Sequence, residues 1–384
     1  MSGEKERRRS FDVLLVVAIG GAEQGVWRAL STADHLERAL PPLLQWLGFL
    51  AVGASVLAGA RLGARSGALA ALGVFVFGCL MLNDQHTLLG ATLVNAAHHA
   101  FVPCLLAFFA ERLEPAGPSA GRYGRVAAFL LALQLAGGVA PAFLERAALG
   151  SIHAVCTLLA VGAAIALGSL RASPAGAPPM PPLARSAYRG AAPKEGEVPT
   201  PIAGGLRLVA PVVIPAMVFA FIAAARPRDL SAGYAADFVR PMISGFGAIV
   251  FLLGAAVRAK SPAPSPLAIF GGALFLAGLA WTLTRLPATW DLTDAGMMGI
   301  VSAMAPLAMT YAVLATRGRA AVVVIGAFYM VITLAGYAGR SIPHHEEWTV
   351  MLAIVIAALA LVSGVWCVRN AAKLHARFDG GGHP

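Results

Sequence analysis

Long apolar blocks follow one another along nearly the whole chain, and the polar residues gather in the stretches between them. An apolar block of about 17 to 25 residues can cross a bilayer as an α-helix, and lipid offers no hydrogen-bond partner to irregular backbone. The pattern therefore predicts twelve membrane-spanning helices. Their ranges are 11–31, 41–60, 66–83, 87–110, 124–144, 150–170, 205–225, 238–257, 264–284, 295–316, 319–339 and 348–368.

Residues 171–204 break this pattern, because prolines, glycines and basic residues leave no apolar stretch of helical length there. Such a composition is typical of a linker without a core of its own. We therefore predict an all-α polytopic membrane protein in three parts. These are an N-terminal six-helix bundle at 1–170, a cytoplasmic proline-rich connector at 171–204 and a C-terminal six-helix bundle at 205–384.

The composition and the charge distribution agree with a membrane protein. Hydrophobic residues make up 58% of the chain and charged residues 12%, whereas a soluble domain has roughly 25% charged residues. The net charge of +10 comes from basic residues between the apolar blocks, so we interpret it as a topology signal and expect no nucleic-acid partner. With a cytoplasmic N-terminus, most of the 29 Lys and Arg residues fall in cytoplasmic segments, as the positive-inside rule requires. We predict a multi-pass protein of a bacterial inner (plasma) membrane, with both termini cytoplasmic.

Glu23 and Arg28 are charged residues within the first predicted span. An ionised side chain at membrane depth costs roughly 2.5 to 3.5 kcal/mol, so it normally faces a cavity or a partner. Two interpretations of Glu23 stay open: it lines a central cavity that binds solute or protons, or it makes a structural bond to a neighbouring span. Arg28 either joins the same site or snorkels to the outer surface.

Asn95, His98 and His99 lie midway along the fourth predicted span. Histidine titrates near pH 6.5, so either ring could carry a coupled proton, and packing against a backbone carbonyl is the alternative. Adjacent helical residues point about 100° apart, so we expect at most one of the two histidines to face a cavity squarely. That spacing also argues against a metal pair. The chain has no phosphate-binding loop and no CxxC spacing among its 4 cysteines, and we predict no cofactor and no metal.

The segment ARLGARSGA at residues 60–68 is similar to a loop pattern of the major facilitator superfamily, GxLaDRxGR. Leu62, Arg65 and Gly67 match this pattern, and alanines stand at its acidic and final basic positions. The chain thus resembles the superfamily, and within it the proton-coupled oligopeptide transporter branch. The resemblance implies two six-helix bundles and a gating loop that contains Arg65 and Gly67.

Further matches are scattered over both halves of the chain. Pro103 fits a peptide-transporter pattern whose lysine is replaced by Val102. Gln134 replaces an asparagine of a family pattern in the fifth span and is a further candidate for binding solute or protons. The family often has a functional acid at the start of the tenth span, for which Asp291 is our candidate. The positions in register around spans ten and eleven are Pro306, Arg317 and Gly318.

These patterns predict a secondary active transporter rather than an enzyme. The transporter moves a small solute by alternating access, and whether protons drive it is left open. Its expected partners are that solute, protons and the lipid bilayer, and its oligomeric state stays open. Two alternatives remain. One is a non-transporting scaffold or sensor that kept the fold, which the motif losses at Ala64 and Val102 motivate. The other, ranked last, is an intramembrane acyltransferase-like enzyme that uses His98 or His99, beside which the sequence has no partner acid.

Overall fold

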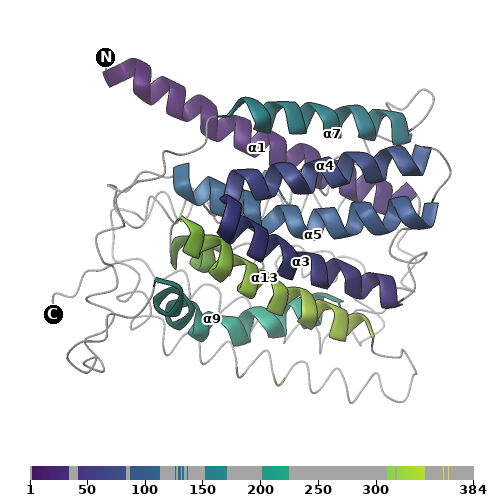
Figure 1. Ribbon diagram of the computed structural model, residues 1–384. Helices are drawn as coiled ribbons and strands as arrows, with labels where there is room; N and C mark the ends of the chain where they lie inside the picture. Colours follow the sequence, from purple (N-terminus) through teal and green to yellow (C-terminus); the bar gives the residue numbers. More distant parts are fainter. Residues whose placement is uncertain are drawn as a thin grey trace, which may run out of the picture. The chain divides into compact units, whose positions relative to one another are not determined.

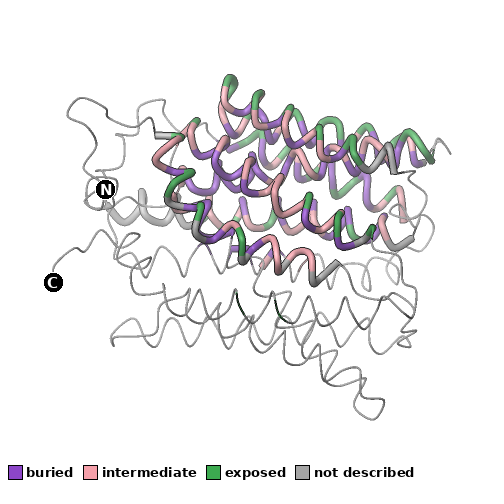
Figure 2. The backbone as a smooth tube through the Cα atoms, turned by 90° about the horizontal axis from the view of Figure 1, so that it is seen from below, coloured by how far each residue is buried: buried purple, intermediate pink, exposed green. Residues whose placement is uncertain are grey.

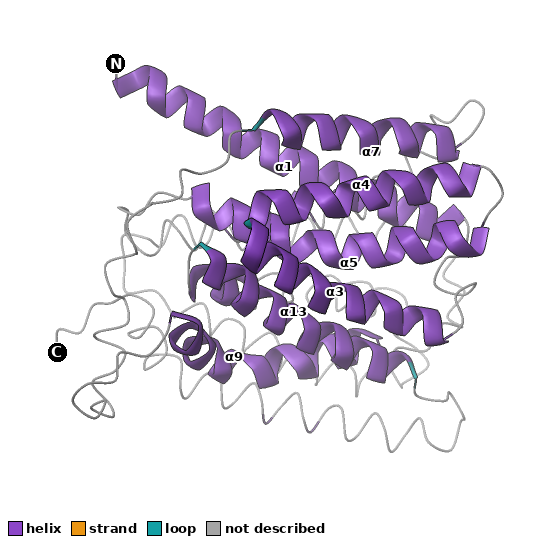
Figure 3. Ribbon diagram, viewed as in Figure 1, coloured by secondary structure: helices purple, strands orange, loops and turns teal. Residues whose placement is uncertain are grey.

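Helices form nearly all of the chain that the structure, a computed structural model, describes (Figure 3). The described residues are 2–33, 42–83, 87–112, 126, 129–130, 132–133, 136, 152–170, 201–224, 309–315, 318–341, 358 and 362. The long helices among them are α1 (Ser2–Ala33), α3 (Pro42–Leu62), α4 (Ala64–Asn83), α5 (Thr87–Arg112), α7 (Ile152–Ser169), α9 (Pro201–Ala224) and α13 (Arg319–Arg340).

Each of these helices coincides with a predicted span, which confirms the helical prediction for that part of the chain. Within the described residues, 5 helices are long and apolar enough to cross a membrane, and a shorter apolar stretch runs from Trp46 to Leu62. The predicted spans at 238–257 and 264–284 lie outside the described residues. The helices found indicate a multi-pass membrane protein, and the total of twelve spans stays a prediction.

The chain divides into two compact units. The first consists of Met1–Glu114, Ala132–Pro179 and Thr316–Met330, so it contains α1, α3, α4, α5, α7 and the first half of α13. The second contains α9 and the rest of α13. Residues 171–200 lie outside the described part, and the predicted boundaries of the connector stay predictions.

Helix α5 forms the centre of the first unit, where it packs against α1, α3 and α4 (Figure 1). Buried and exposed residues alternate along the described helices (Figure 2). Buried residues occur all along α5 from Gly90 to Ala110, as expected of an apolar helix inside a bundle. Helix α7 covers α1 and α4. The outer faces carry large apolar side chains in the open, among them Leu57, Leu158 and Ile165, which are 67%, 72% and 69% exposed. Such faces suit contact with lipid.

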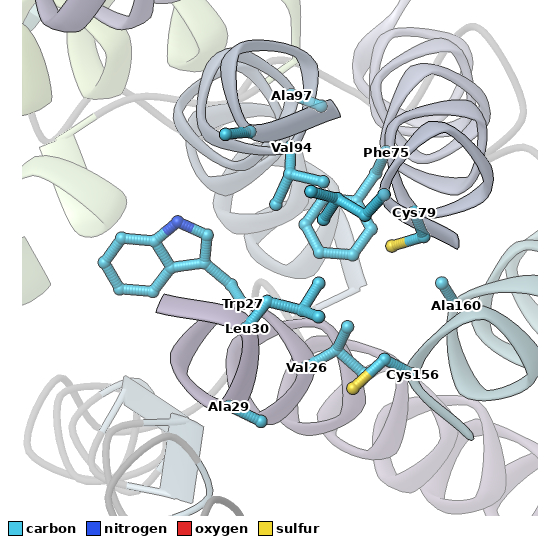
Figure 4. Packing of buried hydrophobic residues seen from close by; sticks show 12 residues of the cluster. Val26, Trp27, Ala29, Leu30, Phe75, Cys79, Val94, Ala97, Cys156 and Ala160 are labelled. Atoms are coloured by element: carbon cyan, nitrogen blue, oxygen red, sulfur yellow. The ribbon is translucent and has the colours of Figure 1, made fainter. Parts of the chain in front are cut away.

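Four helices of this unit meet in one apolar cluster (Figure 4). Its members include Leu30 from α1, Phe75 from α4, Val94 from α5 and Cys156 from α7, all fully buried. The ring of Trp27 lies at the edge of this cluster (Figure 4). The cluster therefore fixes α1 against α5 one turn away from Glu23.

Helices α4 and α5 touch at two glycines. A Cβ at Gly90 would lie 2.8 Å from the backbone nitrogen of Leu82 and 2.9 Å from the carbonyl oxygen of Gly78. A Cβ at Gly78 would lie 2.9 Å from the backbone nitrogen of Val94. Small residues are what allow membrane helices to approach this closely.

The turn between α3 and α4 is tighter than the five-residue loop expected at 61–65. A single residue, Gly63, separates the helices, with a φ of 94° in the left-handed region that favours glycine. Its N–H donates to the carbonyl of Gly59 at 2.9 Å, and its own carbonyl accepts from Gly67 at 3.0 Å. Arg61 and Arg65 therefore lie within helices.

Candidate functional site

The candidate site begins with Glu23, a carboxylate that is fully buried in the apolar face of α1. This face also carries Val16, Ile19, Val26 and Leu30, which recur at the three- and four-residue spacing of one side of a helix. Glu23 is part of that row, so the packing of α1 carries the carboxylate into the interior of the first unit.

His98 of α5 is the partner of this carboxylate. Its Nδ1 lies 2.9 Å from Oε1 of Glu23, and the side chains are 5% and 0% exposed. An ionised carboxylate can only accept, so Nδ1 carries the hydrogen whenever Glu23 is charged. The other oxygen, Oε2, has no hydrogen-bond partner among the residues that the structure describes. The pair therefore combines a proton donor and acceptor in a dry environment.

Trp27 orients the imidazole of His98. The two rings are stacked with centroids 4.0 Å apart and planes 8° from parallel. Trp27 lies four residues after Glu23, so both project from the same side of α1. Helix α1 thus supplies both the carboxylate that bonds His98 and the indole ring on which the imidazole of His98 is stacked. The guanidinium of Arg28 lies 4.7 Å from the centroid of the Trp27 ring, and Arg28 itself is exposed.

His99 points to a different set of neighbours. Its Nδ1 lies 3.0 Å from the hydroxyl oxygen of Tyr329 on α13, within the first unit. Its ring is 5.2 Å from that of His98 and meets the edge of Trp27 at 6.5 Å. Pro103, four residues later in α5, has no N–H to donate to the carbonyl of His99. The regular hydrogen bonding of α5 is thus interrupted beside the site.

Gly48 of α3 lies against the same part of α5. A Cβ there would meet Cδ2 of His99 at 2.8 Å and Nδ2 of Asn95 at 3.0 Å. Asn95 is buried and lies one turn before His99. The structure thus brings together five of the sequence candidates. Arg28, His98 and His99 lie against the ring of Trp27, Glu23 bonds His98, and Asn95 lies one turn before His99. The other two solute or proton candidates, Gln134 and Asp291, lie outside the described residues.

Comparison with solved structures gives the same arrangement of helices in known transporters. The outward-facing crystal structure of FucP, a major facilitator superfamily transporter, matches with a TM-score of 0.61 over 96% of this chain and 99% of its own, at 11% identity. The chain has the major facilitator fold. The POT family transporter PepTSo matches with a TM-score of 0.58 over 94% of this chain and 98% of its own, at 13% identity.

The human organic anion transporter MFSD10 (TETRAN) shares this fold at 16% identity, with a TM-score of 0.57 over 97% of this chain and 98% of its own. No protein-family model and no curated protein matches the sequence. The resemblance to the major facilitator superfamily is thus confirmed at the level of the fold, which a POT family transporter shares.

The loop residues singled out by that resemblance lie at one end of the bundle. Arg65 donates from Nη2 to the carbonyl of Gly168 at 2.7 Å and from Nε to that of Leu167 at 3.4 Å. These carbonyls belong to the C-terminal turn of α7, where a cation also interacts favourably with the helix dipole. Gly67 is buried, and a Cβ there would lie 2.8 Å from Sγ of Cys104. Arg65 thus connects α4 to α7, and Gly67 lets α4 approach α5.

Arg65→Ala is expected to lower the free energy of unfolding by about 1 to 2 kcal/mol, because the last carbonyls of α7 lose a charged donor. Arg61→Ala is the matched control, since Arg61 is exposed in the last turn of α3. Thermal melts of both purified variants in the same detergent measure the difference. Equal melting temperatures for the two variants would contradict this role of Arg65.

Two residues of the site were not predicted from the sequence, Trp27 and Tyr329. Trp27 carried a weak signal, because it follows Glu23 at the four-residue spacing of one helix face. Tyr329 lies at the middle of an apolar span, where a phenol hydroxyl needs a hydrogen-bond partner. The fold also provides the acid that the sequence did not place beside the histidines.

Proposed function

We propose that this protein is a secondary active transporter of the major facilitator type. Twelve membrane helices in two six-helix bundles would alternately expose a site near the middle of the membrane to either side. The coupling ion is a proton, and the pair Glu23–His98 carries it. The observation that supports this assignment is a buried carboxylate–imidazole pair, 2.9 Å apart, in a chain with this fold. Ionisable groups at such depth in membrane proteins commonly mark proton pathways.

The charge of the pair provides a reason for coupling. With Glu23 ionised and His98 neutral, the pair has a charge of −1, and one further proton on the imidazole makes it neutral overall. A neutral ion pair costs less to enclose in a dry site than an uncompensated charge. Closure of the bundles around the pair therefore favours the proton-loaded form, and a ligand that binds one form better shifts the conformational equilibrium.

An uptake screen in proteoliposomes tests the proposal. Purified protein is offered labelled sugars, amino acids and dipeptides, with and without an inward proton gradient. We expect one class of solute to accumulate only with the gradient, and the accumulation to collapse when an ionophore dissipates it. A well-folded protein that accumulates none of them would instead favour the scaffold or sensor alternative.

The topology has its own test, cysteine labelling of intact cells. If the connector and both termini are cytoplasmic, Ser173→Cys is protected from an impermeant external reagent, whereas Ser231→Cys and Thr289→Cys react. The native Cys79, Cys104 and Cys156 are buried. Cys367 lies outside the described residues and is replaced by serine in all labelling variants. External labelling of Ser173→Cys would show that the connector lies outside and that the predicted orientation is wrong.

Two contacts at one end of the first unit support the predicted topology, in which successive helices cross the membrane in opposite directions. Arg112, at the end of α5, bonds Asp12, at the start of the apolar span Phe11–Ser31 of α1, at 2.9 Å. Arg65, at the start of α4, caps the end of α7. Arg112 also interacts electrostatically with Arg65, so the two contacts lie on the same side.

A further inference from the structure

We infer that His99 and Tyr329 form a solute-binding subsite, separate from the Glu23–His98 pair, that takes an uncharged solute through its hydroxyl or amide groups. This inference rests on the transport function proposed above and names the solute class and a residue, Tyr329, that binds it. The two histidines then have different tasks: His98 holds the proton, and His99 contacts the solute.

Exposure, and not depth in the span, distinguishes the two pairs. His99 lies at the midpoint of the apolar span Thr87–Arg112, and Tyr329 at the midpoint of Arg319–Gly339. Both are only partly buried, whereas Glu23 and His98 are buried. Polar side chains at this depth face protein or a water-filled cavity rather than lipid. The exposed part of the His99–Tyr329 pair therefore faces a polar space that solute can enter.

Glycines bring α13 close enough to complete the subsite. A Cβ at Gly326, one turn before Tyr329, would collide with the side chain of Val56 on α3. A Cβ at Gly59 of α3 would lie 2.7 Å from Val322 of α13. Only residues without a side chain permit this approach, and it positions the Tyr329 hydroxyl 3.0 Å from His99.

The chemistry of the subsite favours an uncharged solute. Imidazole and phenol can each donate and accept, so they satisfy one another when the subsite is empty. A solute hydroxyl or amide also donates and accepts. It can therefore bond both His99 and Tyr329 in place of their mutual hydrogen bond, at little net cost in free energy. Asn95, one turn away on α5, adds a carboxamide, and the edge of Trp27 supplies an apolar wall.

The charged groups near the subsite, Glu23 and Arg28, already contact other side chains. Glu23 is bonded to His98, and the Arg28 guanidinium lies against the ring of Trp27. A solute carboxylate drawn to Arg28 is the alternative that the test has to separate. The subsite itself, made of Tyr329, Asn95 and the neutral imidazole of His99, carries no charge.

Thiol labelling measures whether water reaches the subsite. We expect Tyr329→Cys and His99→Cys to react with a hydrophilic reagent about ten-fold faster than Leu334→Cys, because buried or lipid-facing groups react only after a local opening. Leu334 is the matched control, since it is 38% exposed on the same helix but apolar. Equal rates at all three positions would overturn the subsite. Carbethoxylation of the unmodified protein checks the result without substitutions: mass spectrometry should find His99 modified and His98 protected, and the reverse would overturn the division of tasks.

Protection of His99 from carbethoxylation in the unmodified protein tests the solute class. Glucose and an N-acetylated amino-acid amide serve as uncharged probes, and acetate and tetramethylammonium as charged ones. We expect at least one uncharged probe to slow carbethoxylation several-fold, and the charged probes to leave it unchanged. Protection by a charged probe alone, or by none, would overturn the assigned class. Carbethoxylation needs no proton gradient, so a failure of proton-coupled uptake leaves this result readable.

Discussion

The Glu23→Gln variant is expected to lose gradient-driven accumulation of solute almost completely and to keep counterflow exchange. Glutamine has nearly the same shape as glutamate, and its carboxamide can still hydrogen-bond Nδ1 of His98, 2.9 Å away in the native protein. Without the carboxylate, a proton on the His98 imidazole would leave an uncompensated positive charge in the buried site, so His98 stays neutral and the pair no longer changes charge between the two states. Counterflow only exchanges labelled for unlabelled solute and needs no net proton movement. Parallel uptake and counterflow assays in the same proteoliposomes separate the two modes.

The adjacent histidines provide the matched pair of controls. His98→Gln should reproduce the loss of accumulation, whereas His99→Gln should keep accumulation coupled to the gradient and raise the KM for solute. A purely structural bond between Glu23 and His98 predicts something else: lower expression or melting temperature, with both transport modes reduced equally. Wild-type accumulation by a well-folded Glu23→Gln protein would remove this residue from the mechanism.

Gly90→Ala is expected to produce the largest loss of stability among small substitutions in the described helices. The new Cβ would lie 2.8 Å from a backbone nitrogen of α4 and 2.9 Å from a backbone oxygen, and neither can turn aside as a side chain would. The helices must therefore separate, at a cost of about 1 to 3 kcal/mol or more. We expect a clear drop in melting temperature in detergent and loss of monodisperse protein for the larger Gly90→Leu.

Gly73→Ala, on α4 itself, is the control for the same chemical change. Gly73 is exposed, and a Cβ there would have nothing within 4 Å. Alanine forms helix more readily than glycine by up to about 1 kcal/mol, so this variant should melt at or slightly above the wild-type temperature. If Gly90→Ala and Gly73→Ala have the same melting temperature, the close contact of α4 and α5 does not require glycine at position 90.

The helices were predictable because the length of an apolar block is a property of one segment alone. Helices α3, α5 and α13 begin and end within two residues of the predicted spans. The largest difference is at α1, which starts at Ser2 because its polar first residues continue the helix beyond the apolar block. Gly63 was the signal for the tight turn after α3, since its left-handed backbone replaces an entire loop.

The site was predictable only in part, because it depends on contacts between distant segments. Glu23 and His98 were candidates as polar groups in apolar spans, but their separation of 75 positions along the sequence hid the fact that they form a pair. Tyr329 is 230 residues from His99, and its contribution depends on how closely α13 approaches α3. Such pairings follow from helix packing, which hydropathy along the chain does not determine.

The most direct test of the central claim is to measure proton entry together with solute entry. Vesicles that contain the protein and a pH-sensitive dye receive an inward gradient of the transported solute, with no proton gradient imposed. The proposal predicts that solute entry acidifies the lumen of wild-type vesicles, and that Glu23→Gln vesicles exchange solute without acidification. Solute entry without any pH change in the wild-type protein, or acidification that persists in Glu23→Gln, would contradict it.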